Sequence, residues 1–154
     1  MKIKLIALLK RKPGMTKQEF TEYYETRHAP LIAKLLGSCV IEYRRDYIDY
    51  DHPLSYIGTY TDHNKPAEAP FDVVTTQAFA NQQEFDRMFE LLTQPETASA
   101  IAKDETRFLD CACSHIVIVH ESHDTAIVSQ PGQLVGCPSE TVKARTAGEE
   151  VKRT

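Results

Sequence analysis

The side chain in this sequence best suited to proton transfer is His28, near the end of the segment RKPGMTKQEFTEYYETRHAP, residues 11–30. An imidazole titrates near neutral pH, so it can accept or donate a proton in catalysis. At helical spacing His28 shares a stripe with Phe20 and Tyr24, which predicts that it lies on or beside the apolar face of a helix. Pro30 lacks an amide proton and predicts a bend or break close to the imidazole. The spacing alone is equally compatible with a structural histidine in the core or at a helix end.

An aspartate in the otherwise apolar or hydroxylic segment FDVVTTQAF, residues 71–79, is the predicted partner of His28. Burial of the Asp72 carboxylate is costly unless the group is hydrogen-bonded or paired. Pairing with His28 would orient the ring and tune its pKa, so the sequence predicts His28 and Asp72 as the catalytic residues. The alternative is that Asp72 lies at the exposed end of a strand and only terminates the preceding loop.

Weaker signals mark residues for substrate binding. Tyrosines in the strand segment CVIEYRRDYIDY would direct hydroxyls into the same cavity. Helical spacing predicts Phe89 on the buried stripe of the helix at 81–94, where it would also form an apolar wall for a flat ligand. A histidine at the start of the last strand would face either the cavity or solvent. Asp104 and Glu105 are interpreted as solvated or capping residues. The predicted substrate-binding residues are therefore Tyr24, Tyr43, Tyr47, Phe89 and His115.

Hydrophobic periodicity and turn residues predict one α+β domain over residues 1–121, in the ferredoxin-like order β-α-β-β-α-β with an antiparallel sheet. The predicted strands cover 2–10, 39–50, 71–79 and 113–121, and the predicted helices cover 16–36, 81–94 and 95–108. Thr16 and Glu19 have the spacing of a capping box at the first helix. The connection 51–70 is long enough for a lid, a binding loop or a short strand at 55–60. Residues 122–154 are polar and predict an arm or a disordered tail.

Composition excludes several classes of function. With 154 residues and a formal net charge of −4, the chain lacks the basic footprint of a nucleic-acid-binding protein. No apolar run reaches the roughly 18 residues of a membrane helix, so we expect a cytoplasmic protein without a membrane partner. Neither a glycine-rich phosphate loop nor metal-ligand spacing is present, so we expect no cofactor and no metal. Cys111 and Cys113 are too close for a Cys-x-x-Cys pair, and His120 with His123 would form only a weak metal site.

The strand patterns also predict an assembly. An antiparallel sheet with one wet face alternates apolar and polar residues, yet residues 5–9 and 116–119 are continuous apolar runs. Because the helices can cover only one face of the sheet, the other face needs a partner. We therefore expect a homodimer in which two sheets pack face to face.

The order of these short motifs resembles the EthD family of dimeric α+β-barrel proteins. The resemblance covers roughly residues 1–121 and is carried by Lys10 to Lys12, Pro13-Gly14, Met15-Thr16, Glu19-Phe20, Tyr23-Tyr24, His28 with Pro30, Phe71-Asp72 and the segment 104–110. It implies the dimeric barrel fold and supports His28 and Asp72 as functional residues.

Within that family the chain looks most like a fungal lineage that removes carbon dioxide or water from aromatic polyketide intermediates of secondary metabolism. The resemblance thus implies a cofactor-independent lyase, a decarboxylase or a dehydratase, that works by His/Asp general acid-base catalysis. A cofactor-free anthrone-type monooxygenase, a polyketide cyclase and a non-catalytic barrel dimer that binds small molecules remain as alternatives.

Overall fold

The computed structural model describes residues 2–55 and 68–125, and within them it confirms the predicted order β-α-β-β-α-β. The elements are β1 Ile3–Leu9, α1 Lys17–Tyr23, α2 Ala29–Leu36, β2 Glu42–Tyr47, β3 Val73–Phe79, α3 Gln82–Thr93, α4 Pro95–Phe108 and β4 His115–Val119. Residues Met1–Ser122 form one compact unit. The strand predicted at 55–60 lies outside the described residues except for Ser55, which belongs to a short 3₁₀ turn, Pro53–Ser55. Of the predicted arm, 122–154, only the first four residues are described.

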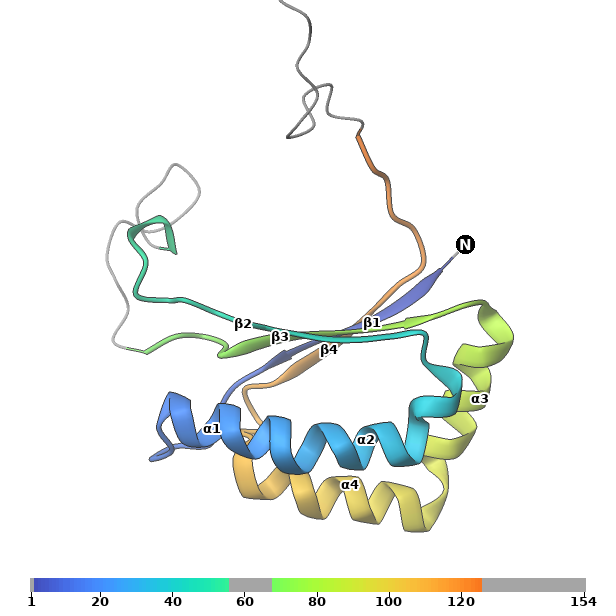
Figure 1. Ribbon diagram of the computed structural model, residues 1–154, viewed down its shortest axis with the longest axis horizontal. Helices are drawn as coiled ribbons and strands as arrows, with labels where there is room; N and C mark the ends of the chain where they lie inside the picture. The colour runs from blue at the N-terminus through green and yellow to red at the C-terminus, as the bar shows by residue number, and fades with distance from the viewer. Residues whose placement is uncertain (1, 56–67, 126–154) are drawn as a thin grey trace, which may run out of the picture. The chain divides into compact units, whose positions relative to one another are not determined.

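The four strands form one antiparallel sheet in the order β2-β3-β1-β4, the arrangement expected of a ferredoxin-like fold. The helices all lie on one side of this sheet (Figure 1). Ala7 of β1 pairs with Thr75 of β3 and with Ile116 of β4, and these three residues face the helices. Leu8 and its register partners, Val74 and His115, therefore face away from the helix layer.

The first helix begins as the sequence predicts. The Thr16 hydroxyl accepts a hydrogen bond from the Glu19 amide at 3.1 Å, and the Glu19 carboxylate accepts one from the Thr16 amide at 2.8 Å. These two bonds form a complete capping box, which satisfies amide protons that have no partner within the helix. Phe20 then turns toward the sheet and is buried.

The predicted irregularity near Pro30 is a π-helical segment, Tyr24–His28, between α1 and α2. Pro30 cannot donate an i→i−4 hydrogen bond, and the Ala29 amide bonds instead to the carbonyl of Tyr24, five residues earlier. The Thr26 hydroxyl donates to the Glu22 carbonyl at 2.6 Å and so supplies a hydrogen bond within the distorted turn. The result is a wider turn that places Tyr24 and His28 together on the buried side of the helix.

Asp72 has a different partner from the one predicted. Its carboxylate accepts a hydrogen bond from the Arg11 amide at 2.8 Å and lies 3.5 Å from Nε of the Arg11 guanidinium. The reason is the antiparallel register: Leu9 is opposite Val73, so Arg11, just past the end of β1, meets Asp72, just before the start of β3. The predicted pairing of Asp72 with His28 is wrong, and so is the alternative of an exposed strand end, because Asp72 is only 6% exposed.

We expect Asp72→Ala to lower the free energy of unfolding by about 1–3 kcal/mol, because it leaves the Arg11 amide and guanidinium without their buried acceptor. Asp86→Ala is the matched control, since its carboxylate accepts an exposed hydrogen bond from Gln82 on α3 and its loss should cost less than about 1 kcal/mol. Urea unfolding measures both variants. Equal stability of the two variants would contradict this role for Asp72.

Candidate functional site

The partner of His28 is Asp104, in the last two turns of α4. Nδ1 of the imidazole lies 2.8 Å from Oδ2 of the carboxylate, and the two residues are only 4% and 9% exposed. The Tyr23 hydroxyl donates to the other carboxylate oxygen at 2.7 Å. Asp104 therefore receives hydrogen bonds from two residues of the first helical stretch, and the interpretation of Asp104 as a solvated or capping residue is wrong.

This geometry fixes the state of the imidazole. A carboxylate accepts hydrogen bonds, so Nδ1 carries the proton and Nε2 keeps its lone pair. Burial lowers the pKa of His28 and outweighs the opposing effect of Asp104, whose hydrogen bond and charge favour the protonated ring. The ring is also held by Tyr24 and Phe108, whose centroids lie 5.0 and 4.8 Å from its own. His28 is thus a neutral, oriented base at neutral pH.

His28 lines a cavity of about 90 Å³ between the sheet and the helices. Most of its lining is aliphatic or aromatic, and Ile116, which is 63% exposed, places its opening beside β4. A liquid water molecule occupies about 30 Å³, so the cavity holds a small reacting group rather than a whole polycyclic molecule. The lining residues are Leu5, Ala7, Leu9, Tyr24, His28, Ile32, Leu36, Tyr43, Thr75, Gln77, Met88, Leu92, Ile101, Glu105 and Ile116.

Five polar residues besides His28 reach this lining, and Glu105 is one of them. The Tyr24 hydroxyl is 2.7 Å from that of Thr75, a closed pair from the π-helical segment and β3. The Tyr43 hydroxyl is fully enclosed and has no hydrogen-bond partner among the described residues, and burial raises its pKa, so it stays protonated. Gln77 is 8% exposed and brings a carboxamide into the lining from the centre of the sheet.

A larger hollow, of about 520 Å³, lies on the outer side of the helices. It is wide open and lined by Lys12, Arg27 and Arg107 together with two acidic residues of α1. Tyr23 also lines this outer hollow, and its hydroxyl donates a hydrogen bond to Asp104, the partner of His28. His28 does not line this hollow, so the smaller inner cavity is the better candidate for proton chemistry.

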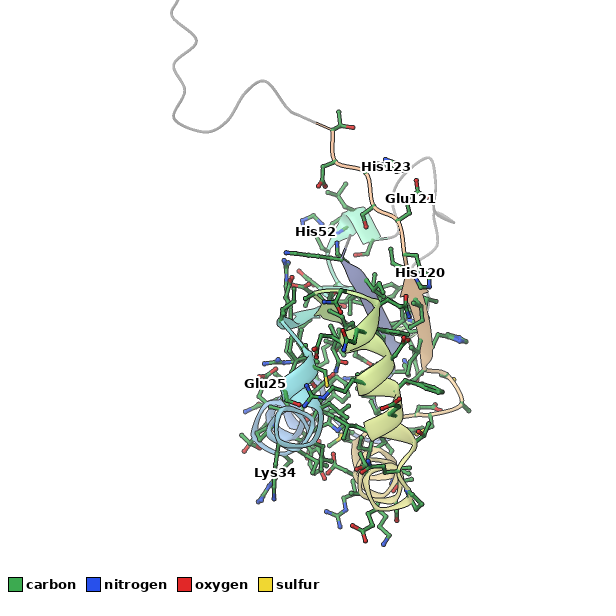
Figure 2. All side chains as sticks on the ribbon, turned by 90° about the vertical axis from the view of Figure 1, so that its right-hand side faces the viewer. Glu25, Lys34, His52, His120, Glu121 and His123 are labelled. Atoms are coloured by element: carbon green, nitrogen blue, oxygen red, sulfur yellow. The ribbon has the colours of Figure 1, made fainter. Side chains whose placement is uncertain are left out.

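The predicted substrate-binding residues divide into two groups. Tyr24 and Tyr43 line the inner cavity, whereas Tyr47, Phe89 and His115 do not. The Tyr47 hydroxyl donates to Glu25 at 2.7 Å, where the helix layer meets β2 (Figure 2). Phe89 is 57% exposed on α3, so the prediction that it belongs to the buried stripe of that helix is wrong.

His115 lies on the opposite side of the sheet from the cavity. Its register partner in β1 is Leu8, which faces away from the helices. Alternation along β4 puts Ile116, the next residue, on the cavity side instead. The aromatic contact of His115 is with Phe71, at a centroid distance of 5.8 Å.

Sequence reasoning missed Asp104, Glu105 and Gln77. A period of three to four residues in α4 puts Asp104 in line with Ile101 and Phe108, both buried, which is a usable signal for a buried carboxylate. Gln77 stands at an inward position of a strand, two residues from buried Thr75. Glu105 gives no comparable signal, because its place in the lining depends on how α4 packs against β4.

No group of three potential metal ligands occurs among the described residues. His120 and Glu121 follow β4 and lie beyond the end of the sheet in Figure 2. Lys34 marks the helix layer in the same view, and the two labelled residues are well separated from it. In the described parts of the chain, no helix is both long and apolar enough to cross a membrane.

Comparisons with known proteins agree with the fold. Residues 12–112 match the EthD domain. An ethyl tert-butyl ether D (EthD) family protein from Bacillus halodurans has a similar structure, with 23% identity, a TM-score of 0.51, and coverage of 79% of this chain and 100% of the other. HapK from Hahella chejuensis is 9% identical, with a TM-score of 0.51, and the match covers 82% of this chain and 99% of HapK.

A protein from Arabidopsis thaliana has the same TM-score of 0.51 at 11% identity, over 80% of this chain and 99% of its own. No curated protein matches the sequence. At these identities the solved structures show a shared fold only. The domain match, which covers well over half of the sequence and contains His28, Asp104 and the π-helical segment, shows that this chain belongs to the EthD domain family.

Proposed function

We propose that this protein is a cofactor-independent lyase, a decarboxylase or dehydratase, in which His28 transfers a proton on an aromatic polyketide intermediate. The observation that carries the proposal is the pairing of His28 with Asp104 at 2.8 Å on the wall of an apolar cavity. Asp104 takes the role that the sequence assigned to Asp72: Asp104 orients the imidazole ring and stabilises the ring when it becomes charged. The substrate class rests on the resemblance to the fungal polyketide lineage.

The reaction needs only groups that the cavity supplies. Nε2 of His28 removes a proton from the carbon next to a substrate carbonyl, and the electrons pass to the carbonyl oxygen as an enolate. The amide of Gln77 lines the same cavity and is suited to donate a hydrogen bond to that oxygen. Apolar walls make such a hydrogen bond stronger than it would be in water.

The size of the cavity limits how a substrate binds. About 90 Å³ accommodates the reacting carbonyl and its neighbours, so the remaining rings of a polycyclic substrate would lie at the opening beside Ile116. That side chain is 63% exposed and offers an apolar surface for them. A second copy of the chain could then complete the binding surface.

We expect His28→Ala to slow turnover of a bicyclic β-hydroxy ketone or β-keto acid by on the order of 10²–10⁴-fold, because the lost group takes the α-proton in a dehydration and gives a proton to the enolate in a decarboxylation. Asp104→Asn should slow it at least about tenfold, because it removes the charge that stabilises the imidazolium. Mass spectrometry of the products, without added cofactor, detects loss of water or carbon dioxide. Glu90→Ala, at an exposed position of α3, is the control and should be unaffected.

Unchanged turnover by His28→Ala would refute the proposal. Unchanged binding of the substrate with no turnover by any form of the protein would favour a carrier.

The charge state of His28 gives a separate prediction. We expect an NMR titration to show a pKa below its ordinary value of 6.5, and Asp104→Asn to lower the pKa further by removing the group that opposes burial. Because the folded protein binds this proton less readily than the unfolded chain, the stabilising contribution is present above 6.5 and is lost as the pH falls through the folded pKa. A pKa at or above 6.5, assigned with His28→Gln, would show that Asp104 outweighs burial.

We also propose that the chain forms a homodimer through the sheet face that lacks helices. Ile6, Leu8 and Val74 in the central strands, with Val117 and Val119 in β4, give this face a continuous apolar strip. Val117 is 46% exposed in the single chain. Burial of such a strip removes apolar area from water at roughly 25 cal/mol per Å², which favours packing against a second copy.

Val117→Asp should therefore convert the dimer to a monomer, because it would bury two carboxylates against the apolar strip. Gln83→Asp, which adds the same charge on the exposed side of α3, is the control and should leave the dimer intact. Light scattering at micromolar concentration measures the mass of each, with circular dichroism to confirm folding. A monomeric wild-type protein would refute the dimer.

A further inference from the structure

A second ionisable group lines the cavity that holds His28. Glu105 follows Asp104 in α4, so its side chain projects about 100° further around the helix. This turn separates the two carboxylates: Asp104 holds Nδ1 of His28, whereas Glu105 lines the inner cavity. The Glu105 side chain forms no hydrogen bond or ion pair with any residue that the structure describes.

The surroundings of Glu105 favour its neutral form. Ile101 and Ile116 line the cavity with it, and none of the lining residues is a lysine or arginine. Burial raises the pKa of Glu105, and the neighbouring charge of Asp104 raises it further. The raised pKa shifts Glu105 toward its protonated form, which can donate a proton, whereas His28 in the same cavity is a proton acceptor.

Resting on the proposed function, we propose that Glu105 is the general acid of a dehydration, and that the substrate is a neutral β-hydroxy ketone. Nε2 of His28 takes the proton from the carbon between the carbonyl and the hydroxyl-bearing carbon. The bond from carbon to the hydroxyl oxygen breaks as the new carbon–carbon double bond forms, and Glu105 gives its proton to the leaving oxygen, which departs as water. The protonated His28 and ionised Glu105 then return to their starting states by proton exchange with solvent.

Charge in the cavity favours loss of water over loss of carbon dioxide. A β-keto acid binds at neutral pH as a carboxylate, which needs a cation or several donors when it leaves water. The described lining offers no cationic side chain and instead brings Glu105 close, so it would repel an anionic substrate. A β-hydroxy ketone carries no charge and can meet both a base and an acid.

The test separates the two proton transfers. The probe is 3-hydroxy-1-tetralone, a bicyclic β-hydroxy ketone, in D₂O, with deuterium uptake next to the carbonyl followed by NMR and formation of 1-naphthol followed by absorbance. For Glu105→Gln we expect deuterium uptake within about threefold of the wild-type rate and dehydration slowed by on the order of 10²-fold, because only the acid is lost. His28→Ala should lose both.

Two control variants distinguish a loss of catalysis from a loss of folding or of surface charge. Glu96→Gln, an exposed position on the same helix, makes the same chemical change outside the cavity and should leave both rates unchanged. Glu105→Asp keeps the acid and should recover part of the dehydration. Dehydration at the wild-type rate by Glu105→Gln, or equal loss of both rates in a folded Glu105→Gln protein, would overturn the role of Glu105.

Wild-type protein that exchanges the proton but never releases water would overturn the dehydration and leave the proposed proton transfer intact. Wild-type protein that does neither would refute the proposed function itself.

Discussion

The hydrogen bond between His28 and Asp104 is the interaction on which the rest of the site depends. It joins residues 76 positions apart and connects the first helical stretch to α4 across the buried interior. Each partner is costly to bury alone, because both the carboxylate and the imidazole lose hydrogen bonds to water when they enter the interior. Together they are satisfied, with Tyr23 as the second donor. The bond also leaves the lone pair on Nε2, so the fold and the proposed proton transfer depend on the same contact.

The π-helical segment explains how this contact can form. Residues four apart already lie on one side of an α-helix, so Tyr24 and His28 share the buried side, at a ring-centroid distance of 5.0 Å. The wider turn, in which the Ala29 amide bonds to the Tyr24 carbonyl, carries the helix past Pro30 while both rings still face the interior. Tyr23 meanwhile reaches Asp104 from the outer side. A proline two residues after a histidine thus shapes the site although its own ring touches none of the chemistry.

The sequence was a good guide to whatever depends on local pattern. The capping box at Thr16, the break near Pro30 and the order of strands and helices follow from spacing, and the structure confirms them. The partner of His28 did not follow, because two aspartates were available and only the packing of α4 decides between them. Asp72 was the wrong choice since the β1–β3 register brings it to Arg11. Phe89 was misplaced for a related reason: helical spacing predicts an apolar stripe but not how far the sheet extends to cover it.

Adjacent residues of α4 show how one fold separates two uses of a carboxyl group. Asp104 accepts hydrogen bonds from two donors, and this environment suits a carboxylate that orients and stabilises an imidazole. Glu105, one residue later, meets an apolar lining, and this environment suits a neutral acid. Helix geometry alone sends the two side chains in different directions, so no further structure is needed to keep their roles apart. Because the described part of the lining presents His28 and Glu105 and no lysine or arginine, it suits the neutral substrate proposed above better than an anionic one.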